Sequence, residues 1–197
     1  MSSPVDPIGA TSAGDAFNIP NSLTLLRILL IPVFVGLMLY ARYDWALGVL
    51  LVAGLTDALD GTIARAANQR TRLGMYLDPL ADKLLLTSGF VTLSVLHLVP
   101  LWVVILVVSR DVILLAGTLL AQLTESDLDI APTLLGKCTT VAQLIYLLVS
   151  VVVLSRQMEG HLVEPLMYMM VALTIGSGAH YLYRGFSRLN AGQAPLL

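Results

Sequence analysis

The chain has 197 residues, of which 57% are hydrophobic and 12% are charged, whereas ordinary soluble domains are about 45–50% apolar and about 25% charged. Six membrane-spanning helices of ~20 residues each account for this composition and leave little room for a soluble domain. The net charge of −2 does not fit a basic nucleic-acid-binding protein. Cys138 is the single cysteine, which excludes an internal disulfide.

The predicted elements begin after residues 1–17, a segment rich in Ser, Gly, Pro and Ala that predicts a disordered tail. Six apolar stretches follow, each about as long as a helix that crosses the hydrocarbon core: residues 24–41, 45–65, 79–98, 101–123, 137–155 and 165–186. We therefore predict an all-α, polytopic membrane protein with six transmembrane helices. Its membrane domain is expected over residues 18–188, followed by a short C-terminal tail over residues 189–197.

The distribution of Lys and Arg predicts the orientation, because cytoplasmic loops carry an excess of these residues. One side of the predicted bundle has eight of them and the opposite side has two, Arg42 and Arg156, while Arg110 lies inside the fourth stretch and is left out of the count. The eight are Arg27, Arg65, Arg70, Arg72, Lys83, Lys137, Arg184 and Arg188. This count predicts that both termini lie in the cytoplasm.

Four aspartates occur where a membrane helix should be apolar, and such residues are costly enough to indicate function. Asp57 and Asp60 belong to the second stretch, and Gly61 and Ala64 follow them. Spacings of three, one and three place all four residues on one helix face. That face offers two carboxylates and then two residues so small that a bulky ligand can approach the backbone.

The other two aspartates open the third stretch. Asp78 is a good N-cap and Pro79 a good first helical residue, and Asp82 lies one turn later on the face of Asp78. Hard oxygen ligands without a Cys or His cluster favour Mg²⁺ or Mn²⁺, and paired ions commonly clamp phosphate oxygens. Two alternatives remain open: the aspartates pair with Arg65 or Lys83 to hold helices together, or they bind translocated cations in an ion-coupled transporter.

Residues 57–82 read DALDGTIARAANQRTRLGMYLDPLAD, which is D-x2-D-G-x2-A-R-x8-G-x3-D-x3-D without departure. This pattern is identified as the signature of the CDP-alcohol phosphatidyltransferases. Residues 18–32 (NIPNSLTLLRILLIP) and 136–143 (GKCTTVAQ) resemble bacterial phosphatidylglycerophosphate synthases. Several other segments, including SRDV at residues 109–112, equally resemble the cardiolipin synthases that use a CDP-lipid donor.

The resemblance implies a homodimeric six-helix enzyme of the bacterial inner membrane, with its active site open to the cytoplasmic leaflet. It implies transfer of a phosphatidyl group from CDP-diacylglycerol to an acceptor hydroxyl, with release of CMP. Two divalent ions, Mg²⁺ or Mn²⁺, are expected on Asp57, Asp60, Asp78 and Asp82, and Asp82 is expected to act also as the general base. The expected nucleotide-binding residues are Gly61, Ala64, Arg65 and Gly74, with Asn21 and Thr24 closing the pocket.

The acceptor is the open question at the level of sequence. Glycerol 3-phosphate, giving phosphatidylglycerophosphate, suits a site rich in Lys and Arg and is the preferred interpretation. The SRDV segment favours phosphatidylglycerol instead, which would make the chain a cardiolipin synthase. Candidate acceptor-binding residues are Arg110, Lys137 and Lys83, although Lys137 equally fits a membrane anchor and Arg110 an ion pair with Asp111.

Overall fold

The structure is a computed structural model of the chain that describes residues 19–67, 72–123 and 134–191. Within these helices, the side chains of residues 19–21, 57–67, 72–79, 82, 117–123, 182 and 184–191 lie outside the described part. The predicted N-terminal tail, residues 1–17, lies outside it as well.

The described residues form an all-helical protein, as the sequence predicts, with no strand among them. In chain order the α-helices are α1 (Ile19–Leu39), α2 (Tyr43–Ala67), α3 (Arg72–Val95), α4 (Leu101–Leu123), α5 (Leu134–Ser155) and α6 (Glu164–Ala191). A short 3-10 helix, η2 (Gly160–Val163), leads into α6.

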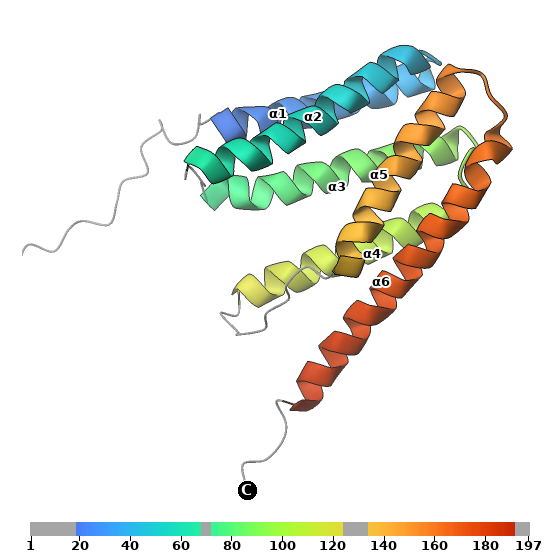
Figure 1. Cartoon of the computed structure of the whole chain (residues 1–197). Helices are drawn as coiled ribbons and strands as arrows, with labels where there is room; N and C mark the ends of the chain where they lie inside the picture. The colour runs from blue at the N-terminus through green and yellow to red at the C-terminus, as the bar shows by residue number, and fades with distance from the viewer. Residues whose placement is uncertain (1–18, 68–71, 124–133, 192–197) are drawn as a thin grey trace, which may run out of the picture.

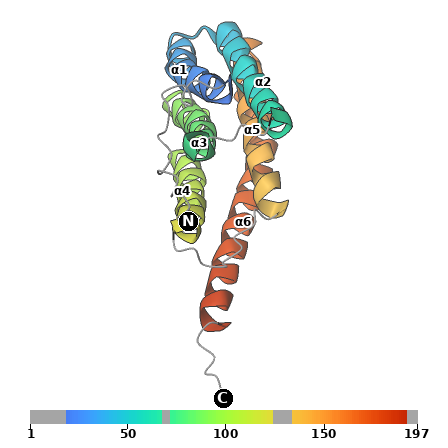
Figure 2. The same ribbon diagram turned by 90° about the vertical axis from the view of Figure 1, so that its left-hand side faces the viewer.

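The helices are arranged in two layers. Figure 2 shows α1, α3 and α4 on one side and α2, α5 and α6 on the other. Helix α1 packs against both α2 and α3, while α5 packs against α2, α3 and α6. Helix α2 ends and α3 begins at one end of the bundle (Figure 1), which we call the signature end, and the opposite end is called the far end.

The start of α3 corrects the sequence prediction. Asp78 was expected to cap this helix and Pro79 to be its first helical residue, but α3 begins at Arg72, so both lie inside it. The connection between α2 and α3 is accordingly shorter than the interval between the predicted stretches 45–65 and 79–98, because α2 continues to Ala67. The segment before Asp78 contains good helix formers such as Arg, Leu and Met. The helix therefore includes this segment, although it lies outside the predicted apolar stretch.

At the far end, α1, α3 and α5 all terminate in the same way. The residues Ala41, His97 and Gln157 have positive φ angles of 56°, 60° and 52°. In α3, the His97 amide donates to the Ser94 carbonyl and the next amide, of Leu98, donates to the Leu93 carbonyl, each at 3.0 Å. Such paired bonds satisfy carbonyls that the helix end would leave unpaired, as in a Schellman motif.

The core lies between the two layers. The rings of Phe90 in α3 and Tyr146 in α5 are stacked with centroids 5.8 Å apart. Gly89 permits this close approach, because a Cβ atom at this position would lie 2.7 Å from Leu147 Cδ2. The packing fixes how far α5 slides along α3, and this register determines which polar groups meet nearer the signature end.

The outer surface of the bundle is strongly apolar. Leu29, Leu55 and Ile105 are 59%, 63% and 60% exposed, and comparable side chains occur on every α-helix. Exposed large apolar side chains in this number are typical of a surface that faces a membrane or a partner rather than water. In the described part of the chain, three helical segments are long and apolar enough to cross a membrane: Ser22–Leu39, Leu134–Ser155 and Gly160–Tyr181.

Candidate active site

The signature residues occupy two helix segments, both at the signature end. Asp57, Asp60, Gly61, Ala64 and Arg65 lie in the C-terminal part of α2. Gly74, Asp78 and Asp82 lie in the N-terminal half of α3. Their side chains are outside the described part, so their expected roles stay predictions. Among the side chains that the structure does describe, no three His, Cys, Asp or Glu residues come together to hold a metal.

Helix α1, which packs against both α2 and α3, carries buried polar side chains. Thr24 is completely buried and Arg27 is only 1% exposed. A buried arginine is costly unless it is paired, so its placement indicates a polar interior at this end of the bundle. Asn21, the other expected pocket residue on this helix, lies within α1, but its side chain is outside the described part.

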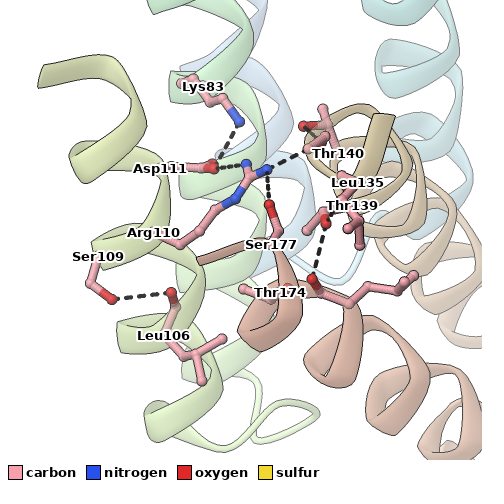
Figure 3. A network of polar contacts seen from close by, with 12 residues as sticks. Lys83, Leu106, Ser109, Arg110, Asp111, Leu135, Thr139, Thr140, Thr174 and Ser177 are labelled. Carbon is pink, nitrogen blue, oxygen red and sulfur yellow. Dashed lines mark hydrogen bonds and ion pairs between the residues drawn. The ribbon is translucent and has the colours of Figure 1, made fainter. Parts of the chain in front are cut away.

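An ionic cluster joins α3 to α4. Asp111 Oδ1 accepts a hydrogen bond from Lys83 Nζ at 2.8 Å and another from Arg110 Nη1 at 2.7 Å (Figure 3). The side chains of Arg110 and Asp111 are each 5% exposed, while that of Lys83 is 23% exposed. Two cations and one carboxylate leave a net charge of +1 in a nearly dry environment.

The same arginine links the cluster to the other layer. Arg110 Nη2 donates to the Gly136 carbonyl of α5 and to Ser177 Oγ of α6, each at 3.1 Å. Beside these bonds, Thr139 Oγ1 is 2.8 Å from the Leu135 carbonyl of its own helix and 3.1 Å from the Leu173 carbonyl of α6. Arg110 thus holds α4, α5 and α6 together, and charge-assisted bonds of this kind are among the stronger ones in proteins.

Several buried polar atoms of α4 and α5 have no hydrogen-bond partner among the residues that the structure describes. They are Asp111 Oδ2, Arg110 Nε and both amide atoms of Gln143, a residue of α5 that is completely buried. Leaving a buried donor or acceptor unpaired costs about 1–3 kcal/mol. The atoms comprise two donors and two acceptors, a combination that suits hydroxyl groups, which both donate and accept.

The three predicted acceptor-binding residues are only partly brought together. Lys83 and Arg110 meet on Asp111, whereas Lys137 is exposed on the first turn of α5, directly after the carbonyl that Arg110 contacts. Sequence reasoning gave no role to Ser177 or Gln143. No local signal would have found Ser177, because it lies 67 residues from Arg110 in the chain.

Comparisons with known proteins show the family to which the chain belongs. A model of the CDP-alcohol phosphatidyltransferase family matches residues 17–176. The chain therefore belongs to the CDP-alcohol phosphatidyltransferase family. Together with the apolar helices, this membership makes the chain an integral membrane protein.

Individual relatives carry two different names. A cardiolipin synthase (CMP-forming) of Homo sapiens is 33% identical over 183 residues, covering 85% of this chain and 61% of the human protein. The CDP-diacylglycerol--glycerol-3-phosphate 3-phosphatidyltransferases of Bacillus subtilis and Escherichia coli are 39% and 38% identical, and each alignment covers 66% of this chain. These alignments cover 74% and 75% of the bacterial proteins. The chain thus spans about three fifths of the human relative and three quarters of the bacterial ones.

Proposed function

We propose that the chain transfers a phosphatidyl group from CDP-diacylglycerol to an acceptor hydroxyl and releases CMP. The observation that carries this proposal is the complete signature over residues 57–82, which spans the C-terminal part of α2 and the N-terminal half of α3, in a chain that belongs to the family. Family membership also favours an enzyme over the ion-coupled transporter considered from the sequence.

The proposed arrangement in the membrane has all six α-helices spanning a bacterial inner membrane, with both termini and the signature end in the cytoplasm. It is supported by the excess of Lys and Arg on that side, eight against two. Helix lengths of 21 to 28 residues are also sufficient for spanning. A fluorescent protein fused after Leu197 should fold and fluoresce, whereas alkaline phosphatase at the same position should stay inactive.

The proposed metal site consists of Asp57, Asp60, Asp78 and Asp82. Carboxylates without competing Cys or His ligands fit Mg²⁺ or Mn²⁺. Two such ions, when bound, would neutralise the pyrophosphate and improve CMP as a leaving group. Asp82 is proposed to take the proton from the acceptor hydroxyl, which then attacks the phosphorus on the lipid side.

The proposed nucleotide pocket lies on the same helix faces. Gly61 and Ala64 leave room beside α2 for the cytidine, and Arg65 and Gly74 complete the nucleotide side of the signature. Thr24 is buried on α1, which packs against both signature helices, and this supports its proposed role with Asn21 in closing the pocket. The donor's acyl chains remain in the bilayer while its pyrophosphate reaches the aspartates.

The proposed acceptor is glycerol 3-phosphate, and its phosphate is proposed to bind near Lys83, Arg110 and Lys137. The net charge of +1 on the cluster around Asp111 favours an anionic ligand. Phosphatidylglycerol is the second candidate. It is favoured by Asp111 within SRDV and by the similarity to the human cardiolipin synthase over 85% of this chain.

One experiment tests both parts of the proposal. Purified full-length protein receives CDP-diacylglycerol, Mg²⁺ or Mn²⁺, and either radiolabelled glycerol 3-phosphate or radiolabelled phosphatidylglycerol in parallel reactions. Metal-dependent CMP release with the first acceptor supports the preferred reaction, and labelled cardiolipin supports the second. Absence of CMP release with either acceptor contradicts both. The proposed homodimer is tested on the same sample by light scattering corrected for detergent.

A further inference from the structure

A cavity of about 690 Å³ lies at the far end of the bundle, well away from the signature. It is bounded by the end of α3, the start of α4, η2 and the first turns of α6. From Asp78 to Val95 along α3, the separation is roughly 25 Å at 1.5 Å per residue. The volume is within the range of about 300–1,000 Å³ that is usual for small-molecule sites.

The lining of this cavity is continuous with the apolar outer surface of the bundle. Val91, Val95 and Leu101 line it and are 45%, 59% and 66% exposed, whereas Val104 and Met167 line its buried side. In the proposed membrane arrangement, the exposed residues face the hydrocarbon region. An acyl chain can therefore pass from the bilayer into the cavity without meeting a polar barrier.

One polar group at the cavity makes no hydrogen bond of ordinary geometry to the described residues. Tyr146 lines the cavity and is completely buried, and its hydroxyl has only the Ser150 side chain, one turn further along α5, as a nearby polar neighbour in the described part of the chain. A buried hydroxyl normally finds a partner, since leaving it unpaired costs about 1–3 kcal/mol. The stacking of its ring on Phe90 accounts for the position of the ring but not for the hydroxyl. A ligand with an acceptor oxygen would satisfy it.

The rim of the cavity carries one carboxylate, Glu164, and one imidazole, His97. Glu164, the first residue of α6, is exposed and lines the cavity, and none of the lining residues is Lys or Arg. Tyr168, which is 60% exposed, stands one turn further along α6 and provides an amphipathic ring of the type enriched at membrane interfaces. A carboxylate at this position favours a headgroup with a positive charge over an anionic one.

We propose that this cavity binds one phospholipid of the leaflet at the far end, with a primary ammonium in its headgroup. One acyl chain occupies the apolar interior, the Tyr146 hydroxyl donates to an ester carbonyl oxygen, and the ammonium pairs with the Glu164 carboxylate. The site is separate from the catalytic one, and it depends on the proposed membrane arrangement but not on the proposed reaction.

The test measures lipid retention by native mass spectrometry on the purified full-length protein. Phosphatidylethanolamine, phosphatidylcholine and phosphatidylglycerol with identical acyl chains are titrated separately. We expect one phosphatidylethanolamine per chain to bind more tightly than either other lipid. Glu164→Gln should weaken this binding by about fivefold, as loss of an exposed ion pair would. It should weaken phosphatidylcholine binding less, because a quaternary ammonium has no N–H to donate to the carboxylate. Glu159→Gln is the matched control, because Glu159 is at the same end, does not line the cavity, and places its exposed carboxylate 3.0 Å from His161 Nδ1.

Two further variants test the contribution of the cavity interior to lipid binding independently of the rim residue Glu164. Tyr146→Phe should weaken binding of all three lipids by about fivefold, as loss of one hydrogen bond would, without lowering the thermal stability of the lipid-free protein. Ser94→Phe, which fills the cavity, should abolish retention while CMP release in detergent persists. Equal binding of the three lipids by the wild type, or unchanged phosphatidylethanolamine binding in Glu164→Gln, would overturn the inference. Because retention is measured without substrates, failure of the proposed reaction would not affect this result.

Discussion

Replacing Asp111 by Asn should destabilise the protein strongly, because it removes the one carboxylate from the ionic cluster. Asp111 Oδ1 receives both Lys83 Nζ and Arg110 Nη1. After the substitution, two cations share a site in which the arginine side chain is 5% exposed. Lys83, at 23% exposed, can turn towards solvent, but Arg110 is tied to two other helices and cannot follow.

The expected magnitude follows from the burial of this pair. Removing one partner of a buried ion pair costs about 3–5 kcal/mol, mostly because the other charge remains buried and uncompensated. For a chain of this size, each kcal/mol shifts the midpoint of thermal unfolding by about 2–4 °C, so we expect a fall of about 6–20 °C. The fraction of monodisperse protein that remains after heating in detergent measures this midpoint.

A matched control is available at the far end. Asp44 is exposed and accepts a hydrogen bond from Ser155 Oγ, so Asp44→Asn should cost less than about 1 kcal/mol. Asp111→Glu keeps the charge, so it should lower the midpoint of thermal unfolding less than Asp111→Asn and more than Asp44→Asn. The reasoning is refuted if Asp111→Asn lowers the midpoint no more than Asp44→Asn does.

The existence and order of the helices could be predicted from the sequence because each contains a long apolar stretch. Helix boundaries were less predictable, since an apolar stretch defines the part suited to hydrocarbon rather than the whole helix. Helix α3 begins at Arg72, seven residues before Pro79, which was predicted to be its first helical residue. The additional segment contains polar residues. The C-terminal ends of α1, α3 and α5 could not be predicted from a glycine after the helix. Their left-handed positions are occupied by Ala41, His97 and Gln157 instead.

In the candidate site, too, the sequence predicts the features that depend on local pattern but not those that depend on how the helices pack. The signature over residues 57–82 is contiguous, so spacing alone assigns it to two helices and a short connection. Lys83 and Arg110 were also found as candidate residues, because a charge in an apolar helix is conspicuous. Their convergence on Asp111 and the contact with Ser177 depend on how α3, α4 and α6 slide against one another, and no local pattern encodes that register.

The remaining predictions concern either the rate of transfer or the stability of the helix packing. Asp57→Asn should reduce transfer to below about a tenth of the wild-type rate at saturating Mg²⁺, with normal membrane expression on an immunoblot, because it removes ligand charge without adding volume. Gln143→Leu should raise the thermal midpoint, since it replaces two buried unpaired polar atoms whose burial costs about 1–3 kcal/mol each; a lower midpoint would show that the amide has a partner. Gly89→Val should cost about 1–3 kcal/mol by overpacking against Leu147, and Leu147→Ala should restore part of the loss in the double variant. Asp82→Asn tests the proposed general base, which contributes typically ~10²–10⁴-fold to the rate. If proton removal is its main role, turnover should fall by about that factor while the dependence of rate on metal concentration stays close to that of the wild type. If Asp82 is chiefly a ligand, the apparent metal affinity should fall with the rate, and excess Mg²⁺ or Mn²⁺ should restore turnover. Full rescue in a titration of rate against metal concentration would rule out the base and leave Asp82 as a fourth ligand.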